Sequence, residues 1–109
     1  MIRTSGRYRI VLVTCASVAE ARRVGRSAVE KKLAACANIV TGVESIYRWK
    51  GNVERAREVL VVMKTNAGRL RELEREVKRM HSYEVPEFAA VPIVAGSREY
   101  LEWIRGNAR

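Results

Sequence analysis

Hydrophobic and polar positions follow two periods along this chain, and each period predicts one kind of element. Tyr8 to Cys15 is an apolar, β-branched run, which is typical of a strand buried on both faces. Phe88 to Val94 is expected to be the last main strand, in which Pro92 indicates an edge or a break. In two other segments the apolar residues recur with the helical period, so we expect strands and helices mixed in one chain.

A first amphipathic helix is expected from about Val18 to Leu33. Ser17 and Glu20 have the spacing of a capping box at its start. Gly25 lies among its apolar positions, and we expect it to allow a close approach to the sheet. The apolar face consists of Ala21, Val24 and Ala28.

A second helix is expected to begin at Thr65 or Asn66 and to end near Met80. Its apolar stripe is Leu70, Leu73, Val77 and Met80. Gly96-Ser97 starts a short third helix near the C-terminus. The expected packing residues of that helix are Tyr100, Leu101, Trp103 and Ile104.

Between the two long helices the chain reads as a long hairpin. Ala34 to Lys50 is a bent strand with a bulge or bend at Gly42, and Gly51-Asn52 is the two-residue turn. The return strand, Val53 to Thr65, is polar near the turn and apolar from Val59 onward. The turn-proximal half therefore cannot lie in the core of a single chain. We expect it to project as a ribbon that pairs with another copy of the chain.

The order of elements is β-α-β-β-α-β followed by a helix. It predicts an α+β, ferredoxin-like fold with both long helices on one face of an antiparallel sheet. The other face must be covered by the C-terminal helix or by a neighbouring subunit. Residues 8–109 are expected to form a single domain, and the polar residues 1–7 are expected to be disordered or frayed.

Charge changes this picture little. The chain is 48% hydrophobic and carries a net charge of +9, which raises the question of nucleic-acid binding. Acidic residues interleave most of the basic ones, as on solvated helix faces. RNA-recognition domains of this fold class need aromatic residues on the central strands. Ile10–Cys15 and Val59–Lys64 contain none, so we expect no nucleic-acid partner.

The two cysteines, Cys15 and Cys36, do not suggest a disulfide framework. No segment resembles a signal peptide or reaches the length of a membrane span, so a cytoplasmic protein is expected. Cys15 lacks a phosphatase-like arginine, because the sixth residue after it is Ala21. The chain has no nucleotide-binding, zinc-finger or catalytic-triad signature, and we predict that it is not an enzyme.

Metal binding is the chemistry that the residues favour most. His81, the single histidine, opens a cluster that also holds Glu84 and Glu87. An imidazole together with the thiolate of Cys36 would suit copper or zinc, and the carboxylates could supply oxygen ligands. Such a site would be open or shared between subunits. The alternatives are that His81 is a hydrogen-bonded residue at a helix end and that Cys36 fills the core.

Five blocks in this order resemble the CutA family of divalent-cation tolerance proteins. The resemblance extends over nearly the whole chain. The blocks are Leu33–Ile39, Glu44–Gly51, Val62–Thr65, His81–Glu87 and Tyr100–Ile104.

The resemblance implies a ferredoxin-like subunit in a tight homotrimer, built like the trimeric PII signalling proteins. It implies divalent-metal binding, with copper as the leading ion, in or near clefts between subunits. His81 is the principal ligand it implies, with Cys36, Glu84 and Glu87 as secondary ones. The residues it places at the inter-subunit cleft or interface are Tyr47, Trp49, Lys64 and Tyr83.

Three positions depart from the family pattern. Ser82 stands where many members have proline, and Lys50 stands where many have an acid. Cys15 lies two residues after the position of a cysteine found in some members, so no metal role for it follows from the resemblance. The rival function is a PII-like signalling or scaffold trimer that binds a small anion or a partner protein. Lys64 and the many arginines would suit an anion better than a cation.

Overall fold

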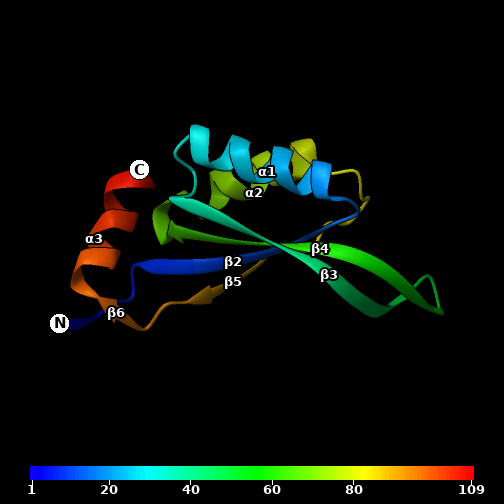
Figure 1. Cartoon of the computed structure of the whole chain (residues 1–109), viewed down its shortest axis with the longest axis horizontal. Coiled ribbons are helices and arrows are strands. Elements are labelled where there is room, and N and C mark those ends of the chain that lie inside the picture. The colour runs from blue at the N-terminus through cyan, green and yellow to red at the C-terminus, as the bar shows by residue number, and fades with distance from the viewer.

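The computed structural model describes all residues of the chain, from Met1 to Arg109. Its main sheet has four antiparallel strands in the order β3-β4-β2-β5 (Figure 1). β2 spans Tyr8–Cys15, β3 Cys36–Trp49, β4 Asn52–Asn66 and β5 Ala89–Pro92. The predicted α+β class is confirmed, and Pro92 ends an edge strand.

Two helices cover one face of this sheet (Figure 1). α1 spans Val18–Glu30, and α2 spans Leu70–Met80 after a 3-10 turn, η1, at Ala67–Arg69. Valine is the most frequent residue of the core between these helices and the sheet, and Met63 and Leu73 are among its largest fully buried side chains. With 13 residues, α1 is the longest helix, and none of the helices is both long and apolar enough to cross a membrane.

α1 begins as its sequence predicts and ends earlier. Ser17 Oγ accepts a hydrogen bond from the Glu20 amide, which confirms the predicted cap. The helix ends at Glu30 because Lys32 adopts a positive φ of 59°, which turns the chain toward β3. At Gly25, an added Cβ would lie 3.0 Å from Ala37 Cβ, so the predicted close approach is present.

The β3–β4 hairpin has the predicted bend but a different turn. The register shifts between Val40 and Val43, and Gly42 there has a φ of 77°. Trp49 pairs with Asn52, so the turn residues are Lys50 and Gly51, and the predicted Gly51-Asn52 turn is wrong by one position. Both turn residues have positive φ, as in a type I′ turn, where glycine is favoured at the second position.

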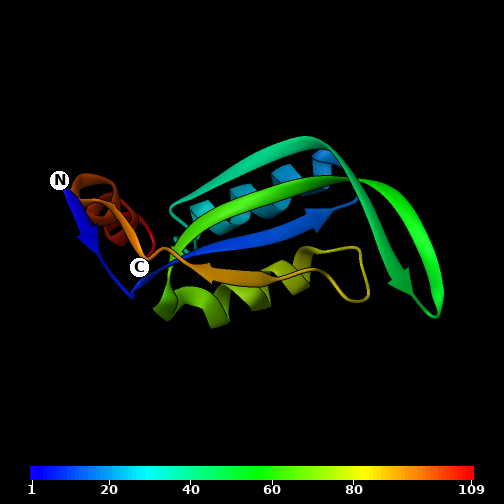
Figure 2. The same ribbon diagram turned by 90° about the horizontal axis from the view of Figure 1, so that it is seen from below.

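The turn-proximal half of this hairpin projects beyond the sheet as a ribbon (Figure 2), as predicted. It gives the molecule a long axis of 46 Å against 24 and 23 Å. Ile46, Tyr47 and Val53 are exposed on it. A two-stranded ribbon is only marginally stable in water, and this one also exposes apolar side chains. The ribbon is therefore a surface suited to association.

The sheet face opposite the two helices carries no helix (Figure 2). Ile10, Leu12, Leu60 and Val62 are half-buried there, while Val40 and Val91 are exposed. The C-terminal helix α3, Arg98–Asn107, does not cover this face. It packs at one end of the sheet through Leu101 and Ile104, in a small cluster with Tyr8.

Two further sequence predictions are corrected at this end of the molecule. Tyr100 and Trp103 are exposed rather than packed in the core. Residues 1–7 contain a strand, β1 at Ile2–Thr4, which pairs with β6 at Ala95–Ser97. All three β1 residues are exposed, so the hydrophobic pattern gave no sign of this strand. Backbone hydrogen bonds to β6 form it.

A nearly buried carboxylate links the two long helices. Glu76 of α2 accepts hydrogen bonds from Ser27, from Lys31 at 2.9 Å and from Arg79 at 2.7 Å. The hydrogen bond from Arg79 is the largest cause that lowers the pKa of Glu76, to about 2, against the opposing effect of burial. The charged form of Glu76 therefore stabilises the contact between α1 and α2.

Acid is expected to remove that stabilisation. The contribution is present above the ordinary carboxyl pKa of 4.5 and is lost as the pH falls toward 2. Because the side chains of Lys31 and Arg79 are 53% and 61% exposed, we expect a loss of only about 1–2 kcal/mol. Urea denaturation of wild type and Glu76→Gln at pH 7 and pH 3 measures it. The variant should be less stable at pH 7 and lose less on acidification; equal losses would contradict the assignment.

Candidate functional site

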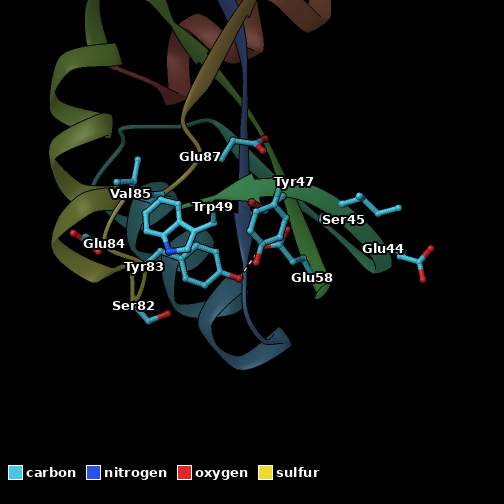
Figure 3. A pocket seen from close by; sticks show the side chains of 13 residues that line it. Glu44, Ser45, Tyr47, Trp49, Glu58, Ser82, Tyr83, Glu84, Val85 and Glu87 are labelled. Carbon is cyan, nitrogen blue, oxygen red and sulfur yellow. Dashed lines mark hydrogen bonds between the residues drawn. The ribbon is translucent and has the colours of Figure 1, made fainter. Parts of the chain in front are cut away.

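A cleft of about 850 Å³ opens where the ribbon leaves the sheet (Figure 3). One wall is the hairpin, and the other is the loop that follows α2. The end of β2 contributes Thr14. The full lining is Thr14, Glu44, Ser45, Ile46, Tyr47, Trp49, Glu58, Ser82, Tyr83, Glu84, Val85, Pro86 and Glu87.

The lining is acidic although the chain as a whole is basic. It has four carboxylates and no lysine, arginine or histidine, in a chain of net charge +9. Glu44 makes an exposed ion pair with Arg55 at 3.8 Å. The other three carboxylates, Glu58, Glu84 and Glu87, have no ion-pair partner and leave the cleft negative. Such a cleft attracts cations and repels anions.

Glu58 is the cleft carboxylate held most firmly. It is only 8% exposed, and its Oε2 accepts a hydrogen bond from the Tyr83 hydroxyl at 2.6 Å (Figure 3). Burial first, and then this hydrogen bond to Glu58, raises the pKa of Tyr83 above its ordinary value. The pair joins β4 to the loop after α2 and fixes the floor of the cleft.

Glu87 shows the effect of burial and of a neighbouring carboxylate. Burial raises its pKa, and the negative charge of Glu58 raises it further. Both causes disfavour the ionised form of Glu87. A cation bound between Glu58 and Glu87 would relieve that repulsion and displace any proton held on Glu87.

The structure gathers five of the predicted site residues in this cleft. They are Tyr47, Trp49, Tyr83, Glu84 and Glu87. Glu58 was not predicted, although the sequence offers one signal: it is an acid directly before the apolar run that starts at Val59. Glu44 was likewise missed, since it lies in the alternating part of the hairpin.

Cys36 and Lys64 lie away from the cleft, near α3. They face each other in the register of β3 and β4. Cys36 Sγ is 3.9 Å from the Tyr100 hydroxyl, and Lys64 donates a hydrogen bond to Asn38. Lys64 is six positions along β4 from Glu58, which corresponds to about 20 Å. Cys36 therefore does not share a site with Glu84 and Glu87 within one chain.

His81 is the residue that ends α2, and its side chain is fully buried. Its Nε2 lies 2.7 Å from the Thr14 carbonyl oxygen, and its Nδ1 accepts the Tyr83 amide at 3.1 Å. The ring packs against Tyr83, with centroids 4.7 Å apart. His81 therefore supports the cleft from behind without lining it, in keeping with the alternative of a hydrogen-bonded helix end.

Fold and cleft together define a small α+β protein with a cation-attracting cleft at the root of a projecting hairpin. The sequence model of the family described as CutA1 divalent ion tolerance protein matches residues 9–107. The chain therefore belongs to the CutA1 family, as the five sequence blocks predicted.

Individual relatives agree with this assignment. The divalent-cation tolerance protein CutA of Thermus thermophilus is 47% identical over 98 residues, which cover 90% of this chain and 95% of that protein. The solved structure of a divalent cation tolerance protein from Thermus thermophilus superposes with a TM-score of 0.92 at 45% identity, covering 94% of this chain and 99% of that one. The chloroplastic CutA of Arabidopsis thaliana is 42% identical over 100 residues, which cover 92% of this chain and 55% of that protein.

Proposed function

We propose that the protein is a homotrimer that binds divalent cations in its acid-lined clefts and so contributes to tolerance of these ions. The observation that carries the proposal is the lining itself: four carboxylates and no basic side chain in a chain of net charge +9. The role is one of binding, not of catalysis. We place it in the cytoplasm, where its two free thiols would stay reduced.

The trimer is supported by two apolar surfaces that one chain leaves uncovered. The first is the sheet face opposite the helices, around Leu12 and Val62. The second is the ribbon, where Ile46 is 67% and Val53 65% exposed. In the proposed PII-like assembly of ferredoxin-like subunits, the sheet faces meet at the centre. The ribbons reach the neighbouring subunits, so each cleft lies at a boundary between subunits.

Copper remains the first ion to test, for a different reason from the one the sequence suggested. His81 and Cys36, the predicted nitrogen and sulfur ligands, do not line the cleft. Its donors are carboxylate and phenol oxygens. Among first-row divalent ions, copper binds a given oxygen or nitrogen site most tightly, so we expect Cu²⁺ to lead and Mn²⁺ to bind more weakly.

The rival function, binding of a small anion, has one observation in its favour. A shallow depression between α1 and β3 is lined by Arg22, Arg23 and Arg26. Arg26 faces Glu30 at 4.0 Å, and these arginines lie on an open helix surface. The depression therefore offers an anion less enclosure than the cleft offers a cation.

A thermal-shift screen separates the two functions. A ligand at about 100 times its dissociation constant adds about 2.7 kcal/mol to stability, which is several degrees in melting temperature for a domain of this size. We expect Cu²⁺, Zn²⁺ and Mn²⁺ salts to raise the melting temperature and nucleotides and organic acids to leave it unchanged. A rise with an anion and none with any divalent cation would favour the rival function.

A further inference from the structure

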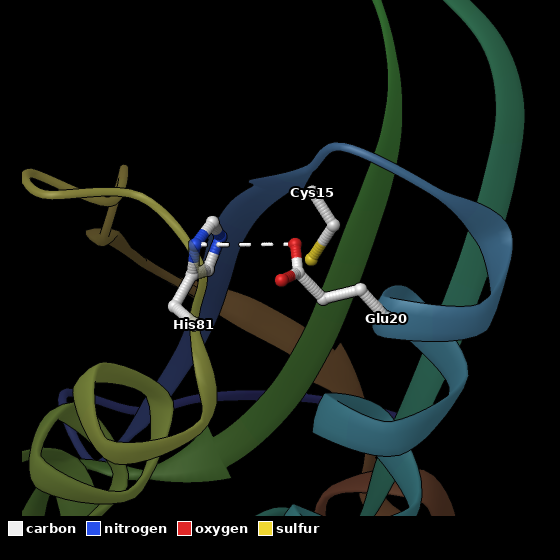
Figure 4. A group of neighbouring side chains, drawn as sticks. All are labelled: Cys15, Glu20 and His81. Carbon is white, nitrogen blue, oxygen red and sulfur yellow. Dashed lines mark ion pairs between the residues drawn. The ribbon is translucent and has the colours of Figure 1, made fainter.

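A second group of metal-ligating side chains lies beside the cleft (Figure 4). Cys15 ends β2, Glu20 lies in the first turn of α1, and His81 follows α2. Their candidate ligand atoms all lie within 4.8 Å of one another. All three side chains are nearly or fully shielded from solvent. Three different elements therefore bring a thiol, a carboxylate and an imidazole to one enclosed point.

The hydrogen bonds of His81 define its tautomer. The Thr14 carbonyl oxygen can only accept, so Nε2 carries the proton and donates it. The Tyr83 amide can only donate, so Nδ1 carries a lone pair. Nδ1 also lies 4.0 Å from Glu20 Oε1. Histidines that bind metals commonly donate their other ring N–H to a backbone carbonyl, and His81 already has this arrangement.

Glu20 is held in place by two backbone amides. Its Oε1 accepts a hydrogen bond from the Ala16 amide at 3.2 Å, and its Oε2 accepts one from the Ser82 amide at 2.9 Å. A carboxylate offers about four acceptor positions. Glu20 can therefore keep both hydrogen bonds and still coordinate a cation through a free oxygen lone pair. The carboxylate is thus oriented toward the group by contacts that a metal ion need not break.

We propose that Cys15, Glu20 and His81 bind one borderline divalent ion, for which zinc is the model. Thiolate, imidazole and carboxylate are the ligand types of zinc sites, and three protein ligands leave the fourth position open to water. Ligands of a tetrahedral zinc ion lie about 3.5 Å apart, given bonds of about 2.0–2.3 Å. The group therefore has to contract by about 1 Å from its present spacing.

Binding requires two local changes. Burial raises the pKa of Cys15 to about 12, so the thiol is protonated in the free protein and releases its proton to solvent when the ion binds. The Tyr83 amide must also turn away from Nδ1. Tyr83 lies in the loop between α2 and β5, where a peptide can rotate without breaking a helix or a strand.

The ligands of this site are not the carboxylates of the cleft. None of its three residues lines the cleft, although Thr14 and Ser82 next to them do. Its thiol ligand is Cys15, whereas the sequence analysis paired His81 with Cys36. Binding at this site and binding at the cleft can therefore each fail alone.

Titration with Co²⁺ tests the site, because Co²⁺ takes the place of zinc and a bound thiolate gives a charge-transfer band in the near ultraviolet. We expect the band to saturate at one ion per chain in wild type and in Cys36→Ser, and to be absent in Cys15→Ser. Glu20→Gln, which keeps the size and one acceptor oxygen, should bind Co²⁺ at least about 10-fold more weakly, since loss of even a residue that only supports a ligand typically costs that much. Circular dichroism checks that each variant is folded.

A wild-type protein without the band would overturn the proposal, as would a band that disappears in Cys36→Ser and persists in Cys15→Ser. If Cys15→Ser does not fold, the Co²⁺ titration of Glu20→Gln tests the proposal instead. An affinity of Glu20→Gln equal to that of wild type would also overturn the proposal. The variant Glu58→Gln/Glu87→Gln should keep the band at full strength. Loss of cleft binding would thus be distinguished from loss of this site.

Discussion

Replacing Leu12 with aspartate is expected to break the proposed trimer into single chains. Leu12 is half-buried in the middle of β2, on the sheet face that no helix covers. In a single chain an aspartate there would reach water at little cost. In the trimer it would place an unpaired charge at the centre of each interface, which costs several kcal/mol per copy. Light scattering should show the mass falling to one third, together with a lower melting temperature.

Val29→Asp is the matched control for this change. Val29 is 38% exposed on α1, on the helical side of the molecule. The same substitution there should leave the mass unchanged and alter the melting temperature by only a few degrees. If wild type itself has the mass of one chain, or if Leu12→Asp keeps the mass of three, the sheet face is not the surface that assembles the protein.

The hydrophobic pattern predicted the main elements because each long element buries one periodic face. α2 keeps Leu73 and Val77 in the core as its stripe predicted. The errors fall where backbone geometry or hydrogen bonding decides instead of burial. The turn at Lys50-Gly51 follows from strand register, and β1 is held by backbone pairing with β6 and by an exposed Arg3–Glu102 ion pair.

The candidate site was predictable only in part, for a related reason. The segment from His81 to Glu87 is contiguous, so the sequence alone shows it as a cluster. Glu58, which accepts the hydrogen bond of Tyr83, is 25 residues distant in sequence. Its contact exists only because β4 and the loop after α2 meet in space. The partners of His81 were missed in the same way, since Cys15 and Glu20 lie on β2 and α1.

Removing two cleft carboxylates is expected to abolish most of the divalent-ion affinity of the cleft. Glu58→Gln/Glu87→Gln keeps the side-chain size, and the amide oxygen at position 58 can still accept the Tyr83 hydroxyl hydrogen bond. Only the two negative charges are lost. Unit charges 4 Å apart near a protein surface attract by about 4 kcal/mol, part of which desolvation offsets. We therefore expect a loss of affinity on the order of 100-fold for the pair.

A matched control removes the same charge outside the cleft. Glu72 and Glu74 lie on α2 and do not line the cleft. Glu72→Gln/Glu74→Gln changes the net charge of the chain as much as the cleft variant does. It should leave ion affinity within about twofold, because these exposed carboxylates lie outside the lining, each is paired with a basic side chain, and salt screens exposed charges.

Equilibrium dialysis against Cu²⁺ and Mn²⁺ measures ion binding by the cleft, with Cys15→Ser/Cys36→Ser as the background so that thiols do not contribute. If the acid-lined cleft binds the ions, the Cys15→Ser/Cys36→Ser background protein and its Glu72→Gln/Glu74→Gln derivative should each take up one ion per cleft with similar affinity. The Glu58→Gln/Glu87→Gln derivative should take up far less at the same free concentration. Equal uptake by all three proteins, or none by the background protein, would show that the cleft carboxylates do not bind these ions.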